Sequence, residues 1–148
     1  MSNDRLREEI LGFFADRFGV SRSIFDGLHL DEHGDDIWAA SDGPHPNLSA
    51  RRPAGLRILR RTPKGLKPTS SFLILLGSRV LRARVELQIN DLESILLGRR
   101  LTTSLSDGHA ALSYRGDIVG CGHVRNGEVQ ALIPTGRRRE LLEALAEE

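Results

Sequence analysis

The sequence predicts an α+β protein, with a small N-terminal α/β portion in residues 1–54 and a mixed β-pseudobarrel with flanking helices in residues 55–148. Three observations lead to this prediction. Apolar residues near the amino terminus recur at the period of a helix. Short apolar stretches then alternate with turn-forming residues, as in strands. Near the carboxyl terminus, two glycine-containing turns separate further apolar stretches, which is the pattern of consecutive hairpins.

The N-terminal portion predicts a helix, a hairpin and a connection. Residues 4–18 are amphipathic at helical spacing. Two short apolar strands, 28–30 and 37–40, are separated by the acid-rich residues 31–36, which predict a wide loop. Residues 41–53 are rich in Pro, Gly, Ser and Asn, so we expect a flexible connection there.

The middle of the chain is basic and partly ambiguous. Residues 55–61 predict a short strand with cationic exposed positions, and residues 62–68 predict a basic loop. Residues 72–76 fit either a buried strand or a one-turn helix. Thr69 as a helix N-cap and Gly77 as a terminator favour the helix.

The last third predicts a strand, a helix, two hairpins and a closing helix. Residues 80–89 alternate as a half-buried strand, and Asn90 caps a helix that Gly98 ends. The hairpin turns are Arg115-Gly116-Asp117 and Asn126-Gly127; Asn-Gly is a strong hairpin signal because both residues tolerate a positive φ. Residues 138–146 predict a helix with leucines on one side.

Composition limits the classes of protein. A chain of 148 residues with 39% hydrophobic and 28% charged residues fits one globular domain or two small ones. The N-terminus is too polar for a secretory signal, and no apolar run approaches the ~20 residues of a membrane span. A single cysteine excludes an internal disulfide and a multi-cysteine zinc site. We therefore expect a cytoplasmic protein with no membrane partner.

Charge is divided unevenly along the chain, although the net charge is only +1. Residues 1–50 hold ten acidic and four basic residues, whereas residues 51–84 hold ten Lys or Arg and no acid. Residues 85–148 hold seven basic and ten acidic residues. Such asymmetry indicates a surface for a polyanion; a solvated loop with scattered arginines is the alternative interpretation.

No catalytic residue, metal ligand or cofactor site is predicted. Cys121 is the one thiol, and no neighbouring base is evident in the sequence, so it is interpreted as a small buried hydrophobe. His29 and His33 have a helical spacing but lie in a predicted strand and turn, without a metal-binding motif. A small enzyme that uses Cys121 or a histidine remains a third, less favoured hypothesis.

The C-terminal residues resemble a PUA domain, an RNA-binding pseudobarrel. The order that carries the resemblance is Asn90, Gly98, Gly108, Tyr114-Arg115-Gly116, Val119-Gly120-Cys121-Gly122, Asn126-Gly127 and Ile133-Pro134, followed by Arg137, Arg138 and Arg139. It is most similar to the PUA-like region of Sun-family RNA cytosine-5 methyltransferases and covers about residues 55–139. The resemblance implies that the helix after Asn90, the Gly122 strand and the basic edge after Pro134 border an RNA.

The candidate RNA-binding residues combine this resemblance with the basic segments. They are Arg57, Arg60, Arg61, Lys64, Lys67, Arg99, Arg100, Gly122, Arg137, Arg138 and Arg139. Prolines stiffen the loop that carries Lys64, and a rigid loop loses less entropy when it binds phosphates. Exposed aromatic candidates are limited to Trp38 and Tyr114, so recognition is expected to rest on shape and charge.

The chain departs from the methyltransferases in having one cysteine, preceded by glycine, where they need a Pro-Cys nucleophile and a cofactor-binding domain. We therefore expect a stand-alone, non-catalytic protein without a cofactor that grips structured tRNA or rRNA and assists an RNA-modification enzyme in trans. The alternative is a ribosome-biogenesis adaptor resembling factors of the nucleolar Nip7 type, in which the acidic N-terminal portion binds a pre-ribosomal protein.

Overall fold

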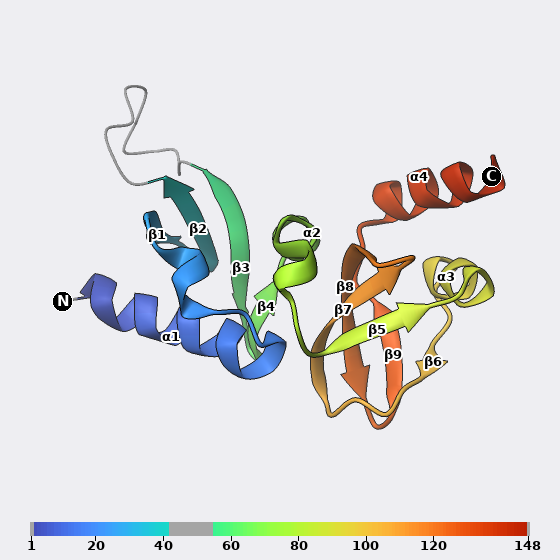
Figure 1. The fold of residues 1–148 in the computed structure, drawn as a ribbon, viewed down its shortest axis with the longest axis horizontal. Helices are drawn as coiled ribbons and strands as arrows, with labels where there is room; N and C mark the ends of the chain where they lie inside the picture. The colour runs from blue at the N-terminus through green and yellow to red at the C-terminus, as the bar shows by residue number, and fades with distance from the viewer. Residues whose placement is uncertain (1, 42–54, 148) are drawn as a thin grey trace.

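The computed structural model describes residues 2–41 and 55–147 and has two β-sheets, each covered by helices (Figure 1). The elements are α1 (Ser2–Phe18), η1 (Arg22–Phe25), β1 (Leu28–His33), β2 (Asp36–Ser41), β3 (Leu56–Thr62), β4 (Gly65–Pro68), α2 (Ser70–Leu76), η2 (Gly77–Arg79), β5 (Arg84–Leu87), α3 (Ile89–Leu96), β6 (Leu101–Thr102), β7 (Gly108–Tyr114), β8 (Asp117–Arg125), β9 (Glu128–Ala131) and α4 (Thr135–Ala146). The α+β class is confirmed. No helix within the described ranges is both long and apolar enough to cross a membrane.

The N-terminal sheet has the antiparallel order β1-β2-β3-β4, and α1 packs against one face of it (Figure 1). Its core contains the fully buried side chains of Phe14, Phe18 and Phe25. The sheet extends to Pro68, past the division expected at residue 54. Within residues 62–68, expected to be a loop, Gly65–Pro68 form β4 instead, because they pair with the end of β3. At the turn, the Thr62 hydroxyl donates to the Gly65 carbonyl over 2.8 Å.

The acid-rich residues 31–36 form strand rather than the expected wide loop. β1 runs to His33 and β2 begins at Asp36, so only Gly34 and Asp35 remain for the turn. Gly34 has φ +61, which a glycine adopts without strain. Acidic side chains are compatible with strand here because they are exposed or half-buried. The flexible connection expected over residues 41–53 lies, beyond Ser41, outside the described residues.

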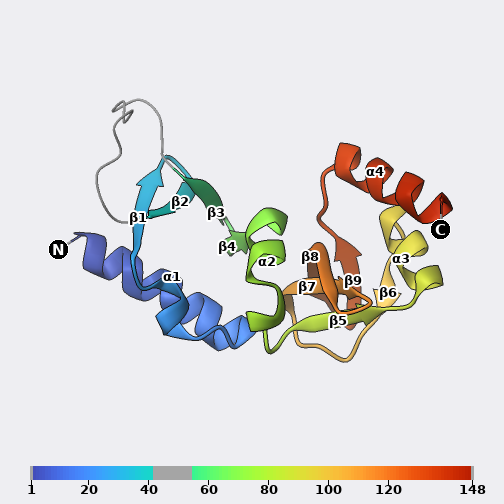
Figure 2. The ribbon, with the colours of Figure 1, turned by 45° about the horizontal axis from the view of Figure 1, so that its top comes forward.

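Helix α2 lies between the two sheets (Figures 1 and 2) and confirms the helical interpretation of residues 72–76. The Thr69 hydroxyl accepts from the Phe72 N–H over 3.1 Å at the N-cap, and Gly77 ends the helix with φ +54. Phe72 is buried and lies in contact with the Phe14 ring, with centroids 5.2 Å apart. Helix α2 is therefore fixed by the N-terminal core.

The second sheet has the order β5-β7-β8-β9-β6 and curls into a half-barrel. β5 and β7 are parallel, and the other pairs are antiparallel. The turns at Arg115-Gly116 and Asn126-Gly127 are confirmed, with φ values of 51, 84, 51 and 78. Helix α3 connects β5 to β6, the two edge strands, and α4 lies beside α3 (Figures 1 and 2).

The start of α3 differs from the expectation. β5 ends at Leu87, and the helix begins at Ile89 with Gln88 as its N-cap, whereas the sequence predicted a strand to residue 89 and a cap at Asn90. Gln88 and Asp91 form a reciprocal capping box, which provides the side-chain acceptors that the first turn requires. This earlier start places Leu92, Ile95 and Leu96 in the core of the half-barrel.

Candidate nucleic-acid interface

Two sets of hydrogen bonds hold the sheets at a defined distance. Arg17 of α1 donates through Nε to the His109 carbonyl over 2.7 Å and through Nη1 and Nη2 to Ser106 over 2.8 and 2.9 Å. On the other side, the Ser70 hydroxyl accepts from the Cys121 N–H over 2.9 Å. These contacts connect α1 and α2 to the half-barrel, so the surfaces between them have a fixed shape.

A cleft of about 340 Å³ lies beside α2, and we call it the α2 cleft. Its walls come from β3, β4, α2, β8 and the segment around Pro134. The lining residues are Arg57, Arg60, Lys67, Pro68, Thr69, Ser70, Ser71, Ile74, Val119, Leu132, Pro134 and Arg137. Four are cationic and none is acidic. The basic hairpin and the basic edge after Pro134, far apart in the sequence, therefore border one cleft.

A bulge in β3 places two arginines of this cleft at the surface. Ile37 pairs with Leu59 and Trp38 with Arg57, so Ile58 is an extra residue in the ladder. Ile58 and Leu59 are consequently both buried, and the arginines on either side, Arg57 and Arg60, are both exposed. A regular strand would turn one of them toward the core.

Carboxylates near these cations are few and loosely placed. Asp36 lies 3.7 Å from the Arg57 guanidinium and 4.0 Å from that of Arg60, longer than a hydrogen bond. Arg137 contacts Glu140 over 3.1 Å, one turn along α4, with both side chains at least half exposed. The exposed Arg137–Glu140 pair contributes about 0–1 kcal/mol, so a multivalent anion can compete for Arg137.

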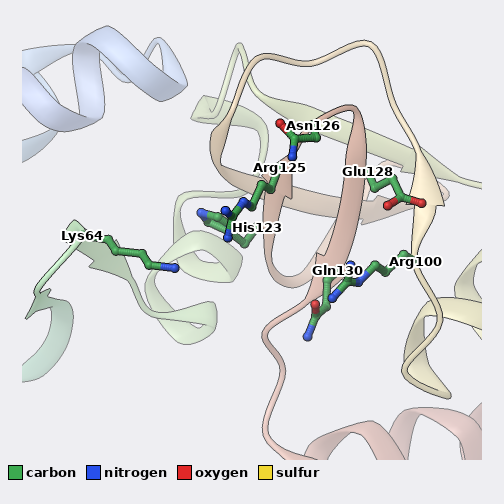
Figure 3. A pocket seen from close by; sticks show the side chains of 7 residues that line it. All are labelled: Lys64, Arg100, His123, Arg125, Asn126, Glu128 and Gln130. Atoms are coloured by element: carbon green, nitrogen blue, oxygen red, sulfur yellow. The ribbon is translucent and has the colours of Figure 1, made fainter.

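A second cleft, of about 430 Å³, lies over the ends of β8 and β9, and we call it the β8–β9 cleft (Figure 3). Its lining residues are Lys64, Arg100, His123, Arg125, Asn126, Glu128 and Gln130. All are polar, and three are permanently cationic. In Figure 3, Lys64 extends from the β3–β4 turn toward His123 and Arg125, so the two sheets again supply opposite walls.

The two clefts follow one another along the same elements. Gln130 lines the β8–β9 cleft and Leu132, two residues on, lines the α2 cleft, consistent with one face of an extended segment. On the opposite wall, the β3–β4 hairpin also contributes to both clefts: Lys64 lines the β8–β9 cleft and Lys67 lines the α2 cleft. Together they present seven Lys or Arg side chains and one carboxylate, that of Glu128.

Arg61, a predicted RNA-binding residue, lies elsewhere. Its guanidinium donates to both Glu9 oxygens over 2.8 and 2.7 Å, and also to Glu32. These bonds raise the pKa of Arg61 and lower that of Glu9. Arg61 joins α1 to the sheet and is neutralised there, so the structure assigns it a role in the fold instead of the cleft.

Gly122, another predicted RNA-binding residue, lies inside the half-barrel and lines neither cleft. It is buried, and a Cβ there would lie 3.0 Å from Leu112 and 3.0 Å from Val129. The missing side chain serves packing inside the half-barrel, not approach by a ligand.

Arg138, also a predicted RNA-binding residue, lines neither cleft. It is half-buried and donates to the Thr135 hydroxyl over 3.2 Å.

The other predicted cations divide between the two clefts and the open surface. Arg57, Arg60, Lys67 and Arg137 line the α2 cleft, and Lys64 and Arg100 line the β8–β9 cleft. Arg99 and Arg139 are exposed and line neither cleft.

Several residues that line the clefts were not predicted as binding residues from the sequence. They are Thr69, Ser70, Ser71, His123, Arg125 and Gln130. The pairing of His123 with Gln130 and of Arg125 with Glu128 follows directly from the Asn126-Gly127 turn, so counting outward from that turn was a usable signal. The serines offered none, because hydroxyl groups at a helix start are explained equally well by capping.

Burial favours the neutral forms of the half-buried His109 and the buried Cys121. Burial, the neighbouring His123 and the charges of Lys67 and Arg17 lower the pKa of His109 to about 4. Burial raises the pKa of Cys121 to about 12, and its side chain is 1% exposed. Cys121 therefore lacks the accessibility and the thiolate character that a nucleophile needs. Within the described part of the chain, no cluster of three His, Cys, Asp or Glu is placed to hold a metal ion.

No known protein-family model matches the sequence, and no curated protein matches it. The described residues form a two-sheet α+β protein with cationic clefts between the sheets.

Proposed function

We propose that this protein is a non-catalytic RNA-binding protein of the PUA type that grips structured tRNA or rRNA in the clefts between its two sheets and assists an RNA-modification enzyme. One observation supports this most strongly. Cations from two separate segments of the chain line a single cleft: Arg57, Arg60 and Lys67 on one side and Arg137 on the other. Within the described part of the chain, no acidic residue lines this cleft.

Charge and shape favour a nucleic-acid backbone as the ligand. A row of cations along adjoining clefts releases condensed counterions when it meets successive phosphates, which favours a polymer over a single anion. The hydrogen bonds of Arg17 and Ser70 hold the walls in place before binding, so little entropy is lost. The mixed half-barrel with its two hairpins and flanking helices is compatible with a PUA-type domain.

The test is the salt dependence of RNA binding. Affinities of the protein for a tRNA transcript and for a ribosomal RNA hairpin are measured by fluorescence anisotropy from low to physiological salt. The double variant Arg57→Ala/Arg137→Ala removes one cation from each wall, and Arg5→Ala/Arg79→Ala removes two exposed cations outside both clefts.

We expect the cleft variant to bind roughly tenfold more weakly and to reduce the slope of log affinity against log salt by about two. The matched control variant should keep the slope of the unaltered protein. Equal losses in both variants, or absence of binding at low salt, would contradict the proposal.

A further inference from the structure

The two clefts differ in their chemistry, and the difference concerns what each can hold. Every lining residue of the β8–β9 cleft is polar. The α2 cleft has the cations Arg57, Arg60, Lys67 and Arg137 but also five apolar lining residues, Pro68, Ile74, Val119, Leu132 and Pro134. Phosphates are held by cations and N–H groups, so an RNA backbone by itself makes no use of an apolar wall.

An apolar wall beside a cationic rim fits a ligand that is flat and weakly polar at one end and anionic at the other. A nucleotide with an unstacked base has this character. Ile74 is 40% exposed although it is a large aliphatic residue, so part of the wall is open to a ligand. The guanidinium groups of Arg57 and Arg60 are planar and can stack on a base or bind its phosphate.

The size and the rigidity of the α2 cleft also fit. Its volume of about 340 Å³ lies at the lower end of the ~300–1,000 Å³ range of small-molecule pockets, which is compatible with one nucleotide. Pro68 and Pro134 restrict the backbone on two sides. The Ser70 hydroxyl is fixed by the Cys121 N–H, and the Thr69 hydroxyl donates to the Arg57 carbonyl over 2.9 Å.

We infer that the α2 cleft takes one unpaired nucleotide of the bound RNA, with the base against Ile74 and Leu132 and the phosphate among the arginines. This inference rests on the proposed RNA binding. It makes the protein a reader of bulged or looped RNA, while the β8–β9 cleft holds the neighbouring backbone.

The experiment compares three hairpin RNAs that share the same stem sequence. One is fully paired, one carries a single bulged 2-aminopurine, and one carries an abasic site at the bulge. We expect the bulged RNA to bind about tenfold more tightly than the other two. The fluorescence of the bulged 2-aminopurine should change on binding, because its base leaves water. Equal affinity for all three would overturn the inference, and so would equally tight binding of free 2-aminopurine riboside monophosphate.

A matched pair of variants separates the base from the backbone. Ile74→Gln should remove the preference for the bulged RNA, so that the bulged RNA binds no more tightly than the paired hairpin. Leu75→Gln alters the adjacent residue, which is 67% exposed and outside both clefts, and should keep the preference. If all three RNAs bind alike but Arg57→Ala/Arg137→Ala still weakens them, the inference fails and the proposed function stands; if none binds, the proposed function itself fails.

Discussion

The Cys121 N–H donates to the Ser70 hydroxyl over 2.9 Å, which ties the first turn of α2 to β8. Through this bond a helix fixed by the N-terminal core is also attached to the half-barrel. Since Ser70 lines the α2 cleft, the same hydroxyl sets the distance between the cleft walls. The Ser70 hydroxyl therefore contributes both to stability and to the shape of the candidate site.

Ser70→Ala should lower the free energy of unfolding by about 1–2 kcal/mol, because the Cys121 N–H loses its partner in a partly buried position. Urea denaturation followed by circular dichroism measures the change. Ser71→Ala, an exposed neighbour on the same helix, is the control and should stay within about 0.5 kcal/mol of the unaltered protein. Equal effects of the two substitutions would argue against a structural role for the bond.

Gly120→Ala should destabilise the protein by about 1–3 kcal/mol, because the added Cβ would lie 2.5 Å from Cγ1 and 2.7 Å from Cδ1 of Ile133. Thermal unfolding of the single variants and of Gly120→Ala/Ile133→Ala forms a double-mutant cycle. We expect the double variant to be less destabilised than the sum of the single variants, since the collision is removed. Gly136→Ala has open space around its Cβ and should be neutral or stabilising by up to about 1 kcal/mol.

Acid should destabilise the protein through His109, whose pKa in the fold is about 4. The unfolded chain has a pKa near ~6.5 at this residue, so it takes up the proton first as the pH falls. The free energy of unfolding should therefore decrease between about pH 6.5 and pH 4, and be unaffected by this group above that window. Urea midpoints of the unaltered protein and of His109→Gln across this range check the prediction; an unchanged pH dependence in the variant would refute it.

Arg60 and Arg61 are adjacent but should respond oppositely to substitution. Arg61→Ala breaks the contacts with Glu9 and Glu32 and should cost up to about 1 kcal/mol of stability, with RNA affinity unchanged. Arg60→Ala should weaken RNA binding with little effect on stability. Denaturation and fluorescence anisotropy on the same two proteins test both expectations. A loss of RNA affinity in Arg61→Ala would show that Arg61 takes part in RNA binding.

The contribution of the Arg61 contacts should also depend on pH. The hydrogen bond from Arg61 holds the pKa of Glu9 below its ordinary value. The Glu9 carboxylate therefore stabilises the fold fully at pH values above the ordinary pKa of a glutamate. This contribution is lost as the pH falls through the lowered pKa. The stability difference between the unaltered protein and Arg61→Ala should therefore shrink in acid, and a difference that grew on acidification would contradict the assignment.

Local signals in the sequence were sufficient for much of the fold. The Asn126-Gly127 turn and the Thr69 and Gly77 boundaries of α2 were predicted, because each depends on a few neighbouring residues and their backbone preferences. Boundaries that depend on pairing partners were not. The extension of β1 and β2 through acidic residues and the existence of β4 follow from ladders between strands, which residue types in one segment do not reveal.

The sequence by itself determined that this chain has a cation-rich, acid-free middle segment and a basic edge after Pro134. Only the tertiary structure decided which of these cations act together. The β3 bulge turns Arg57 and Arg60 outward and leaves Arg61 bound to Glu9, and the packing of α2 against β8 brings Arg137 to the same cleft. The physical reason is that charge belongs to single residues, whereas a binding surface requires distances and directions set by contacts between segments far apart in the chain.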